Sequence, residues 1–385
     1  MTAATLRIGA PGAARRRLPV PALSDPWLLG IALSVLALGL VMVASTSISV
    51  AARDTGIPLY YFQRQLVFAI AGFGCGWLAT WVPLSFWERT GPLLLAGAFV
   101  LLVLVLVPGI GREVNGAQRW ISLGFFRVQA SEPARLLLLM YLAGYLVRYQ
   151  ESVRTEFRGF AKPMFVLAVS ALLLLMQPDF GATVVMLTAA LAMIFIGGVM
   201  LRHFAAVGVI VSLGMALLVW VSPYRLRRLL GFRDPWADPF DSGFQLTNSL
   251  IAIGRGEWFG VGLGNSVQKL FYLPHAHTDF LYAVYAEEFG LIGVALLLAA
   301  FFCLIWRALA AGRASARVGK LYGAYLAFGI GTWLGVQALI NVGVNMGALP
   351  TKGLTLPLMS YGGASLLVTC FSIGLLLRIA HEAKQ

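Results

Sequence analysis

The side chains best suited to chemistry lie in the segment His275-Ala276-His277-Thr278-Asp279, directly before a long apolar run. A carboxylate at the boundary between water and lipid can act as a general base. Thr278 or Asp279 can equally cap the helix that the apolar run predicts, and the residue types alone do not decide between the two roles. The pair His275 and His277 is a weak metal-binding pattern, because no further ligands follow at a suitable spacing.

Cationic side chains that can hold a phosphate occur in three other polar segments. The first contains Arg112, Arg119, Arg127 and Arg135, together with Gln129 and Glu132. The second, upstream of Asp279, contains Arg255, and the third contains Lys352 as its only charge. Arginine binds phosphate through paired, charge-assisted hydrogen bonds, whereas Lys352 can bind a phosphate or extend into the headgroup region. If these segments meet on one face, they predict an anionic substrate.

The elements that must position these residues are membrane helices. Hydrophobic residues make up 59% of the 385 residues and charged residues 12%, which excludes a soluble domain of this length. Ten apolar runs have about the length needed to cross a bilayer, at residues 27–46, 63–82, 90–108, 133–148, 161–177, 181–200, 203–222, 280–309, 320–343 and 356–379. Their lack of alternation excludes a β-barrel. We therefore predict an all-α, polytopic integral membrane protein with about ten transmembrane helices.

The distribution of basic residues predicts the orientation of these helices. With ten spans, both termini share one face, which carries 16 of the 29 Lys and Arg residues and is therefore predicted to be cytoplasmic. The predicted organisation is a basic cytoplasmic tail at 1–26, helices over 27–222, a large periplasmic loop at 223–279, helices over 280–379 and a cytoplasmic tail at 380–385. The net charge of +13 is scattered through short turns, so it favours anionic lipid over nucleic acid as its counterpart.

Several polar residues fall within or between the apolar runs. Glu287 and Glu288 lie about two turns into the eighth run, so they are expected to be neutral, paired or facing a wet cavity. Gln337, Asn341 and Asn345 follow a four-residue spacing on one helix face, which favours hydrogen bonds between helices over ligand binding. The turn at 177–181 has a structural interpretation, in which Asp179 caps the next helix.

Five sequence runs resemble the SEDS family of cell-wall polymerases, which includes FtsW, RodA and SpoVE. The runs are NGAQRWISLG, RVQASEPAR, YRLRRLLGFRDPWADPF, GLGNSVQKLFYLPHAHTDF and ALPTKGLTLPLMSYGGAS, and the similarity extends from Pro21 to Arg378. The TKG sequence around Lys352 is typical of the FtsW-like members of Gram-negative bacteria. The resemblance implies a peptidoglycan glycosyltransferase that polymerises lipid II at the outer face of the bacterial inner membrane during division at the septum.

The resemblance also implies roles for individual residues. Asp279 stands at the catalytic aspartate of the family, and Arg127 and Arg135 at basic positions linked to lipid II. This sequence departs from the family pattern at three places: Arg135 replaces Lys, His275 replaces Glu, and Ala364 replaces Ser. The change at His275 removes an acid near the predicted active site, so no catalytic or metal-binding role is assigned to that position.

The chemistry of glycan extension independently needs one carboxylate base and several cations. We predict that Asp279 deprotonates the 4-hydroxyl of the acceptor GlcNAc in a single inverting displacement. The residues predicted to bind the pyrophosphate and the rest of the substrate are Arg127, Arg135, Glu132, Arg255 and Lys352. A divalent cation, Mg²⁺ or Mn²⁺, is a possible aid to the leaving pyrophosphate, although no ligands for it are identified.

Two alternatives remain open at this level. Ten helices with buried carboxylates and a polar stripe also fit a flippase that moves lipid II across the bilayer, and a scaffold that only recruits division proteins ranks third. The resemblance implies a class B penicillin-binding protein, FtsI, as partner, together with FtsQ, FtsL, FtsB and FtsN, besides lipid II and the growing glycan strand.

Overall fold

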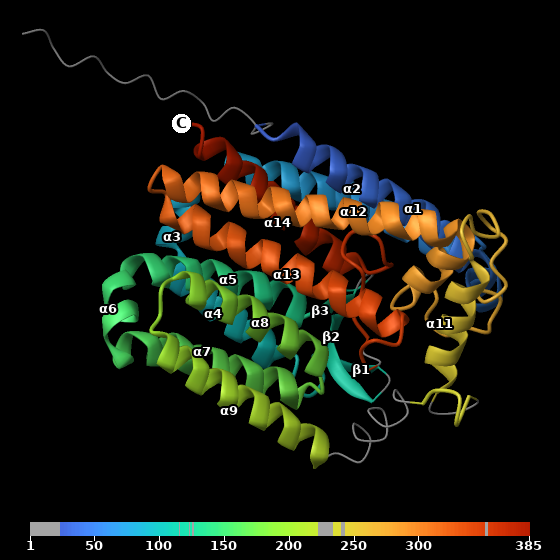
Figure 1. Ribbon diagram of the computed structural model, residues 1–385, viewed down its shortest axis with the longest axis horizontal. Helices are drawn as coiled ribbons and strands as arrows, with labels where there is room; N and C mark the ends of the chain where they lie inside the picture. Colours follow the sequence, from blue (N-terminus) through green and yellow to red (C-terminus); the bar gives the residue numbers. More distant parts are fainter. Residues whose placement is uncertain are drawn as a thin grey trace, which may run out of the picture.

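The apolar runs fold into helices that lie side by side in one bundle (Figure 1). The computed structural model describes residues 24–114, 116–122, 124, 127–221, 234–239, 243–350 and 353–385. Its ten long helices each overlap one predicted range: α1 (Pro26–Thr55), α2 (Tyr60–Trp81), α4 (Gly91–Leu104), α5 (Ser131–Arg148), α7 (Phe157–Met176), α8 (Phe180–Ile196), α9 (Leu201–Trp220), α12 (Leu281–Arg317), α13 (Leu321–Asn345) and α14 (Gly363–Glu382). Shorter helices connect them: α3 (Leu84–Arg89), α6 (Gln150–Thr155) and α11 (Phe244–Arg255).

The outer surface of the bundle is apolar. Large hydrophobic side chains such as Leu93, Phe165 and Leu213 are exposed, where lipid can cover them. Within the described part of the chain, five helices are long and apolar enough to cross a membrane: α1, α7, α12, α13 and α14. Helices α4 and α8 and the first part of α9 are apolar but shorter. The protein is therefore a predominantly α-helical, multi-pass membrane protein, as predicted.

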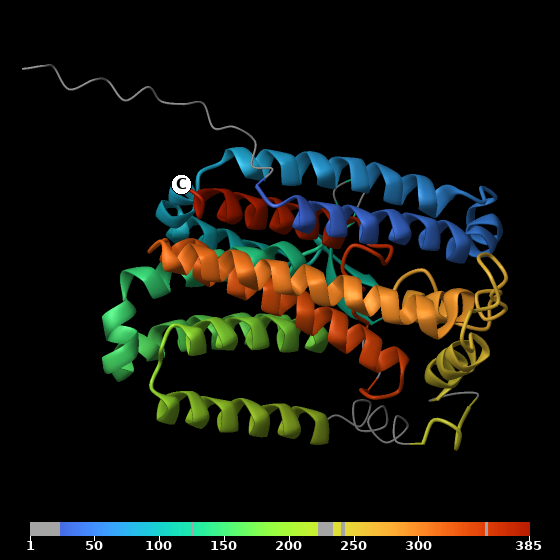
Figure 2. The same ribbon diagram turned by 45° about the horizontal axis from the view of Figure 1, so that its top comes forward.

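Helix α13 occupies the centre of the bundle and contacts α12 on one side and α8 and α5 on the other. Its side chain Trp333 is fully buried, as are Leu326 and Ile330. Helix α9 lies at the edge of the molecule, beyond α7 and α8 (Figure 2). A polar side chain on the inner face of α13 is thus surrounded by protein, which is where the predicted stripe of Gln337, Asn341 and Asn345 lies.

Glycine residues allow the closest approach between two helices of the bundle, α2 and α14. A Cβ atom on Gly76 would lie 2.6 Å from the carbonyl oxygen of Cys370, and one on Gly374 would lie 2.1 Å from the carbonyl oxygen of Gly76. Small residues at such a contact permit backbone packing that larger side chains would prevent. This contact packs the middle of α14 against α2.

A small antiparallel sheet joins α4 to α5, which the all-α prediction did not include. It consists of β1 (Gly111–Val114), β2 (Ala117–Ser122) and β3 (Arg127–Gln129) in the order β1-β2-β3, with Trp120 opposite both Arg112 and Gln129. Strand β3 packs against α5 and α14. The strands are only three to six residues long, too short for an alternating pattern to be read in the sequence.

The two ends of the described chain lie at the same end of the bundle (Figure 1). Ser24 Oγ lies 2.7 Å from His381 Nδ1, and the Asp25 carboxylate accepts from Arg307 Nη2 at 2.6 Å. Lys320 Nζ also donates to a carbonyl near the C-terminus, that of Glu382. The structure thus agrees with the prediction that both termini share one face.

Helix α12 is broken near its start. Gly290 has φ 64° and ψ −167°, a conformation essentially restricted to glycine, so α12 consists of a short first segment and a long second one. Glu287 and Glu288 therefore lie at the end of the short segment. The sequence had suggested that they lie within one continuous span. Backbone hydrogen bonds from Val261 and Gly262 to these two glutamates attach the preceding loop to the break.

Candidate active site

Asp279 lies half-buried in a turn that leads into α12. The turn is closed by the carbonyl oxygen of His275, which accepts from the backbone N–H groups of Thr278 at 3.0 Å and Phe280 at 3.3 Å. The N-cap residue of α12 is Phe280, whose own side chain makes no capping hydrogen bond. Thr278 and Asp279 therefore precede the N-cap residue and do not occupy its position.

The polar stripe of α13 holds the backbone of Asp279. Asn341 Nδ2 donates to the Asp279 carbonyl oxygen at 2.9 Å, and Asn345 Nδ2 donates to the same oxygen at 3.1 Å. Asn345 Oδ1 also accepts from the backbone N–H of Ala283 at 3.3 Å. These bonds connect two elements, as the spacing of the stripe predicted.

The segment before α14 meets Asp279 on its other side. A Cβ atom on Gly353 would lie 2.9 Å from Asp279 Oδ2, so the carboxylate rests against the backbone of this residue. Asn341 Nδ2 donates to the carbonyl of Leu354 at 2.6 Å, and Gln337 Nε2 to that of Thr355 at 2.9 Å. Lys352 lies outside the described residues, but it directly precedes Gly353 in the chain. The predicted base and the segment that bears the predicted lysine are therefore neighbours.

His277 fastens the same turn to α2. Its carbonyl accepts from the backbone N–H of Tyr361 at 2.9 Å, and its ring stacks on Tyr61 with centroids 4.9 Å apart. Gln65 Nε2 donates to the carbonyl of Ser360 and completes the attachment. Burial, helped by the nearby His275, lowers the pKa of His277 from 6.5 to about 4, so the ring is neutral at physiological pH.

Arg135 and Glu132 form a buried ion pair at the start of α5. The Arg135 guanidinium lies over the ring of Trp333, 4.3 Å from its centroid, and Trp333 Nε1 donates to Gln337 Oε1 at 2.7 Å. Asn341 lies eight residues beyond Trp333 on α13, about 12 Å along the helix axis. No direct contact between Arg135 and Asp279 is seen among the described residues, and the Nε and Nη1 atoms of Arg135 have no hydrogen-bond partner.

Arg127 lies at the start of β3 with an exposed side chain. The sheet that carries it is fixed by Asp179, which accepts from Gln129 Nε2 at 2.8 Å and from Ser131 Oγ at 3.0 Å. Asp179 also caps α8 through the backbone N–H of Ala182, as predicted. Because β3 packs against α14, Arg127 belongs to the same end of the bundle as the segment that contacts Asp279.

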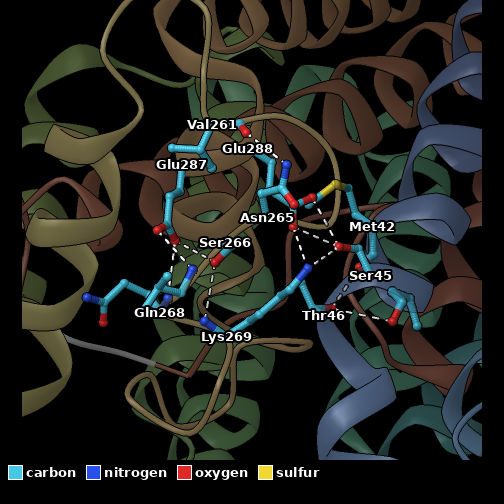
Figure 3. A network of polar contacts seen from close by, with 12 residues as sticks. Met42, Ser45, Thr46, Val261, Asn265, Ser266, Gln268, Lys269, Glu287 and Glu288 are labelled. Carbon is cyan, nitrogen blue, oxygen red and sulfur yellow. Dashed lines mark hydrogen bonds and ion pairs between the residues drawn. The ribbon is translucent and has the colours of Figure 1, made fainter.

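Arg255 belongs to a different polar cluster. Its Nη1 atom lies 3.2 Å from Glu287 Oε1, and Glu287 also accepts from the Ser266 hydroxyl and from the backbone N–H of Val267. Beside it, Lys269 Nζ lies 2.7 Å from Glu288 Oε1 and donates to Ser45 Oγ of α1 at 2.9 Å (Figure 3).

Both glutamates are thus paired, as expected for carboxylates in apolar surroundings. The cluster anchors the loop that leads to Asp279 onto α1 and α12. Sequence reasoning missed this role of Lys269, although a lone lysine between apolar residues is itself a signal of a buried partner. In the described residues, no three His, Cys, Asp or Glu side chains lie close enough to share a metal ion, so no metal ligand is assigned.

Residues 26–385 match the family model FtsW/RodA/SpoVE, described as "Cell cycle protein". The chain belongs to this family. Among its relatives, a protein of Thioalkalivibrio sulfidiphilus named "Probable peptidoglycan glycosyltransferase FtsW" is 56% identical over 360 residues, which cover 93% of this chain and 90% of the relative. A protein of Coxiella burnetii with the same name is 52% identical, with 94% and 97% covered.

Two solved structures share this fold. One, described as "Structural coordination of polymerization and crosslinking by a peptidoglycan synthase complex", is 30% identical with a TM-score of 0.77 and covers 94% of this chain and 98% of its own. The rod shape determining protein RodA of Thermus thermophilus is 28% identical with a TM-score of 0.70 and the same coverage. The family resemblance expected from the sequence is confirmed.

Proposed function

We propose that this chain is a peptidoglycan glycosyltransferase that polymerises lipid II at the periplasmic face of the inner membrane. The observation that carries the proposal is the position of Asp279, a half-buried carboxylate in the turn before α12. The backbone of Asp279 is fixed by α13, and its side chain touches Gly353, the residue after Lys352. The names of the relatives, at more than 50% identity over nearly the whole chain, support the same activity.

In the proposed reaction, Asp279 accepts the proton of the acceptor 4-hydroxyl as that oxygen attacks the anomeric carbon of the donor sugar. The new bond joins the acceptor oxygen to the anomeric carbon, and the bond between that carbon and the pyrophosphate oxygen breaks. The lipid pyrophosphate leaves with the electron pair. Because the attack comes from the side opposite the pyrophosphate, the anomeric centre is inverted. Because the pyrophosphate leaves with the electron pair as an anion, no second carboxylate is needed to protonate it.

The leaving pyrophosphate needs cations, and the candidates differ in their availability. Arg127 is exposed, and Lys352 adjoins the residue that contacts the carboxylate. Arg135 and Glu132 neutralise each other in the protein interior, where two guanidinium nitrogens remain free to donate. Arg255 already pairs with Glu287, so it reaches a substrate only by sharing that pair. We therefore assign the pyrophosphate to Arg127 and Lys352, with Arg135 and Glu132 lining the inner part of the site.

The family's solved complex joins polymerisation to crosslinking. We propose a corresponding partner for this chain, a class B penicillin-binding protein such as FtsI, with FtsQ, FtsL, FtsB and FtsN as regulators at the division septum. The shared face of the two chain ends and its basic residues support cytoplasmic termini. The five-part organisation predicted from the sequence is part of this proposal.

A flippase is the second candidate, and one observation favours it. Polar groups extend from Asp279 into the bundle: Asn341 and Gln337 bind the adjacent carbonyls of Leu354 and Thr355, and Gln337 continues through Trp333 to Arg135. A lipid carrier needs polar groups along its path across the membrane. The exposed Arg127, together with Lys352 next to the residue that contacts the carboxylate, favours the polymerase.

Proteoliposomes with fluorescent lipid II distinguish the two functions. The full chain with its penicillin-binding partner is expected to produce glycan polymer on the outer face without moving labelled lipid II between leaflets. Polymer is measured by gel mobility, and translocation by the loss of label to an impermeant quencher. Translocation without polymer would contradict the proposed function and establish the flippase.

A further inference from the structure

We propose that Asn341 and Asn345 are positioning residues that set the direction of the Asp279 carboxylate for proton transfer, a role that rests on the proposed function. Both side chains are almost completely buried in the central helix, at 2% and 0% exposure. Both donate to one acceptor, the Asp279 carbonyl oxygen. An amide placed only to join two helices needs one such bond, whereas two amides from successive turns converge here on the residue that carries the base.

The peptide unit after Asp279 is held at both of its polar ends. Its carbonyl accepts from Asn341 and Asn345, and its N–H, which belongs to Phe280, donates to the carbonyl of His275 at 3.3 Å. A peptide plane with bonds at both ends cannot rotate without breaking at least one of them. The direction of the Cα–Cβ bond of Asp279 is therefore set by its backbone.

Asn345 extends this restraint into α12. The helix starts without a side-chain cap of its own, and Asn345 Oδ1 accepts from the N–H of Ala283 in its first turn. A single amide thus bonds the carbonyl before the helix and an N–H inside it. The start of α12 cannot shift along its axis relative to Asp279 without loss of one of these two bonds.

Asn341 fixes the opposite wall of the site. The same Nδ2 group that donates to Asp279 also donates to the Leu354 carbonyl at 2.6 Å, one residue after the glycine that touches the carboxylate. Gln337 repeats the contact one residue later, at Thr355. The distance between Asp279 and Gly353 is therefore set by one side chain, and so is the approach of the segment that continues to Lys352.

An engineered disulfide measures this distance without reference to catalysis. In a chain whose three native cysteines are replaced, Asp279→Cys with Gly353→Cys is expected to crosslink readily, because the two side chains would be in contact. Adding Asn341→Ala is expected to slow crosslinking by about fivefold or more. Adding Asn248→Ala provides the matched control: Asn248 is also a buried asparagine, but it donates to a carbonyl of its own helix. It should leave the rate unchanged.

Kinetics on purified lipid II separate positioning from folding. Asn341→Ala and Asn345→Ala are each expected to lower kcat by about tenfold or more while KM stays within about twofold. The reason is that a wrongly oriented base weakens stabilisation of the transition state and leaves substrate binding unchanged. Asn248→Ala should keep kcat, and thermal unfolding should show comparable stability for all three variants.

The outcomes separate the two proposals. Unchanged crosslinking in the Asn341→Ala background, or kcat within twofold of wild type for both asparagine variants, would overturn the positioning role. A purely structural role predicts lower stability with unchanged kcat per folded molecule. If Asp279→Asn polymerises lipid II like the wild type, the proposed base is wrong, and the crosslinking result still reports on the geometry.

Discussion

At the scale of single residues, the site is organised through the backbone around Asp279 more than through its side chain. Two asparagines hold its carbonyl, His275 closes its turn, and Gly353 provides a surface without a side chain against its carboxylate. A base needs a fixed direction and freedom from competing structural bonds. This arrangement provides the first of these two conditions through the backbone.

His277 is expected to make stability depend on pH. Burial lowers its pKa to about 4 in the folded protein, compared with 6.5 ordinarily, so between these values the unfolded chain binds a proton that the folded chain does not. The stability it contributes is present above pH 6.5 and is lost as the pH falls towards 4. His277→Phe, which keeps a ring to stack on Tyr61, should therefore reduce the loss of melting temperature between pH 7 and pH 5.

Asn248→Ala provides the control, since it removes a buried polar side chain but no titratable group and should leave the pH dependence of the melting temperature unchanged. An equal loss of melting temperature in wild type and His277→Phe between pH 7 and pH 5 would show that His277 does not titrate as its burial requires. The measurement is thermal unfolding of the purified protein in detergent at both pH values.

The sequence was informative about single residues wherever burial forces a partner. The spacing of the α13 stripe predicted interhelical bonds. The adjacent Glu287 and Glu288 were expected to be neutral, paired or facing a wet cavity, and the structure shows them paired. The sequence could not show the contact between Asp279 and Gly353, because a glycine in a polar turn does not indicate which distant residue it contacts. The stack of His277 on Tyr61 was hidden for a similar reason: the histidine pair resembles a weak metal pattern, and Tyr61 lies more than two hundred residues away.

At the scale of elements, the break in α12 determines how the loop before Asp279 is attached. Gly290 has a conformation restricted to glycine, and a Cβ atom there would lie 2.4 Å from the backbone nitrogen of Gly260. Gly290→Ala is expected to lower the free energy of unfolding by about 3 kcal/mol or more, since strain and collision add.

Gly319 is the matched control for that substitution. It also has a positive φ, of 76°, but a Cβ atom there would meet nothing within 4 Å. Gly319→Ala should therefore cost only about 1 kcal/mol, the backbone strain alone. Equal losses for Gly290→Ala and Gly319→Ala in denaturant unfolding would mean that the contact between the loop and the break carries no stability.

The elements themselves were largely predictable, for a physical reason. A run of about twenty apolar residues has few alternatives to a membrane helix, so all ten ranges overlap long helices of the structure. The break at Gly290 was not predictable, because a glycine within an apolar run is also compatible with a continuous helix. The sheet at residues 111–129 depends on contacts with α5 and α14, which no local pattern reveals.

At the scale of the whole molecule, orientation in the membrane decides which leaflet supplies the substrate. The large loop and the chain ends should be on opposite sides. In a chain without its native cysteines, Leu263→Cys on the exposed loop is expected to react with an impermeant thiol reagent in intact spheroplasts. Lys384→Cys near the C-terminus should react only after permeabilisation. Labelling of Lys384→Cys in intact spheroplasts would reverse the proposed topology.

The central claim is that one carboxylate performs the base chemistry of lipid II polymerisation. Its most direct test is the initial rate of glycan synthesis from purified lipid II by the full chain with its penicillin-binding partner. We expect Asp279→Asn to lower this rate by about a hundredfold or more, the usual contribution of a general base. Asp54→Asn, which alters an exposed aspartate at the end of α1, should stay within about twofold. A rate for Asp279→Asn within a few-fold of wild type would contradict the account.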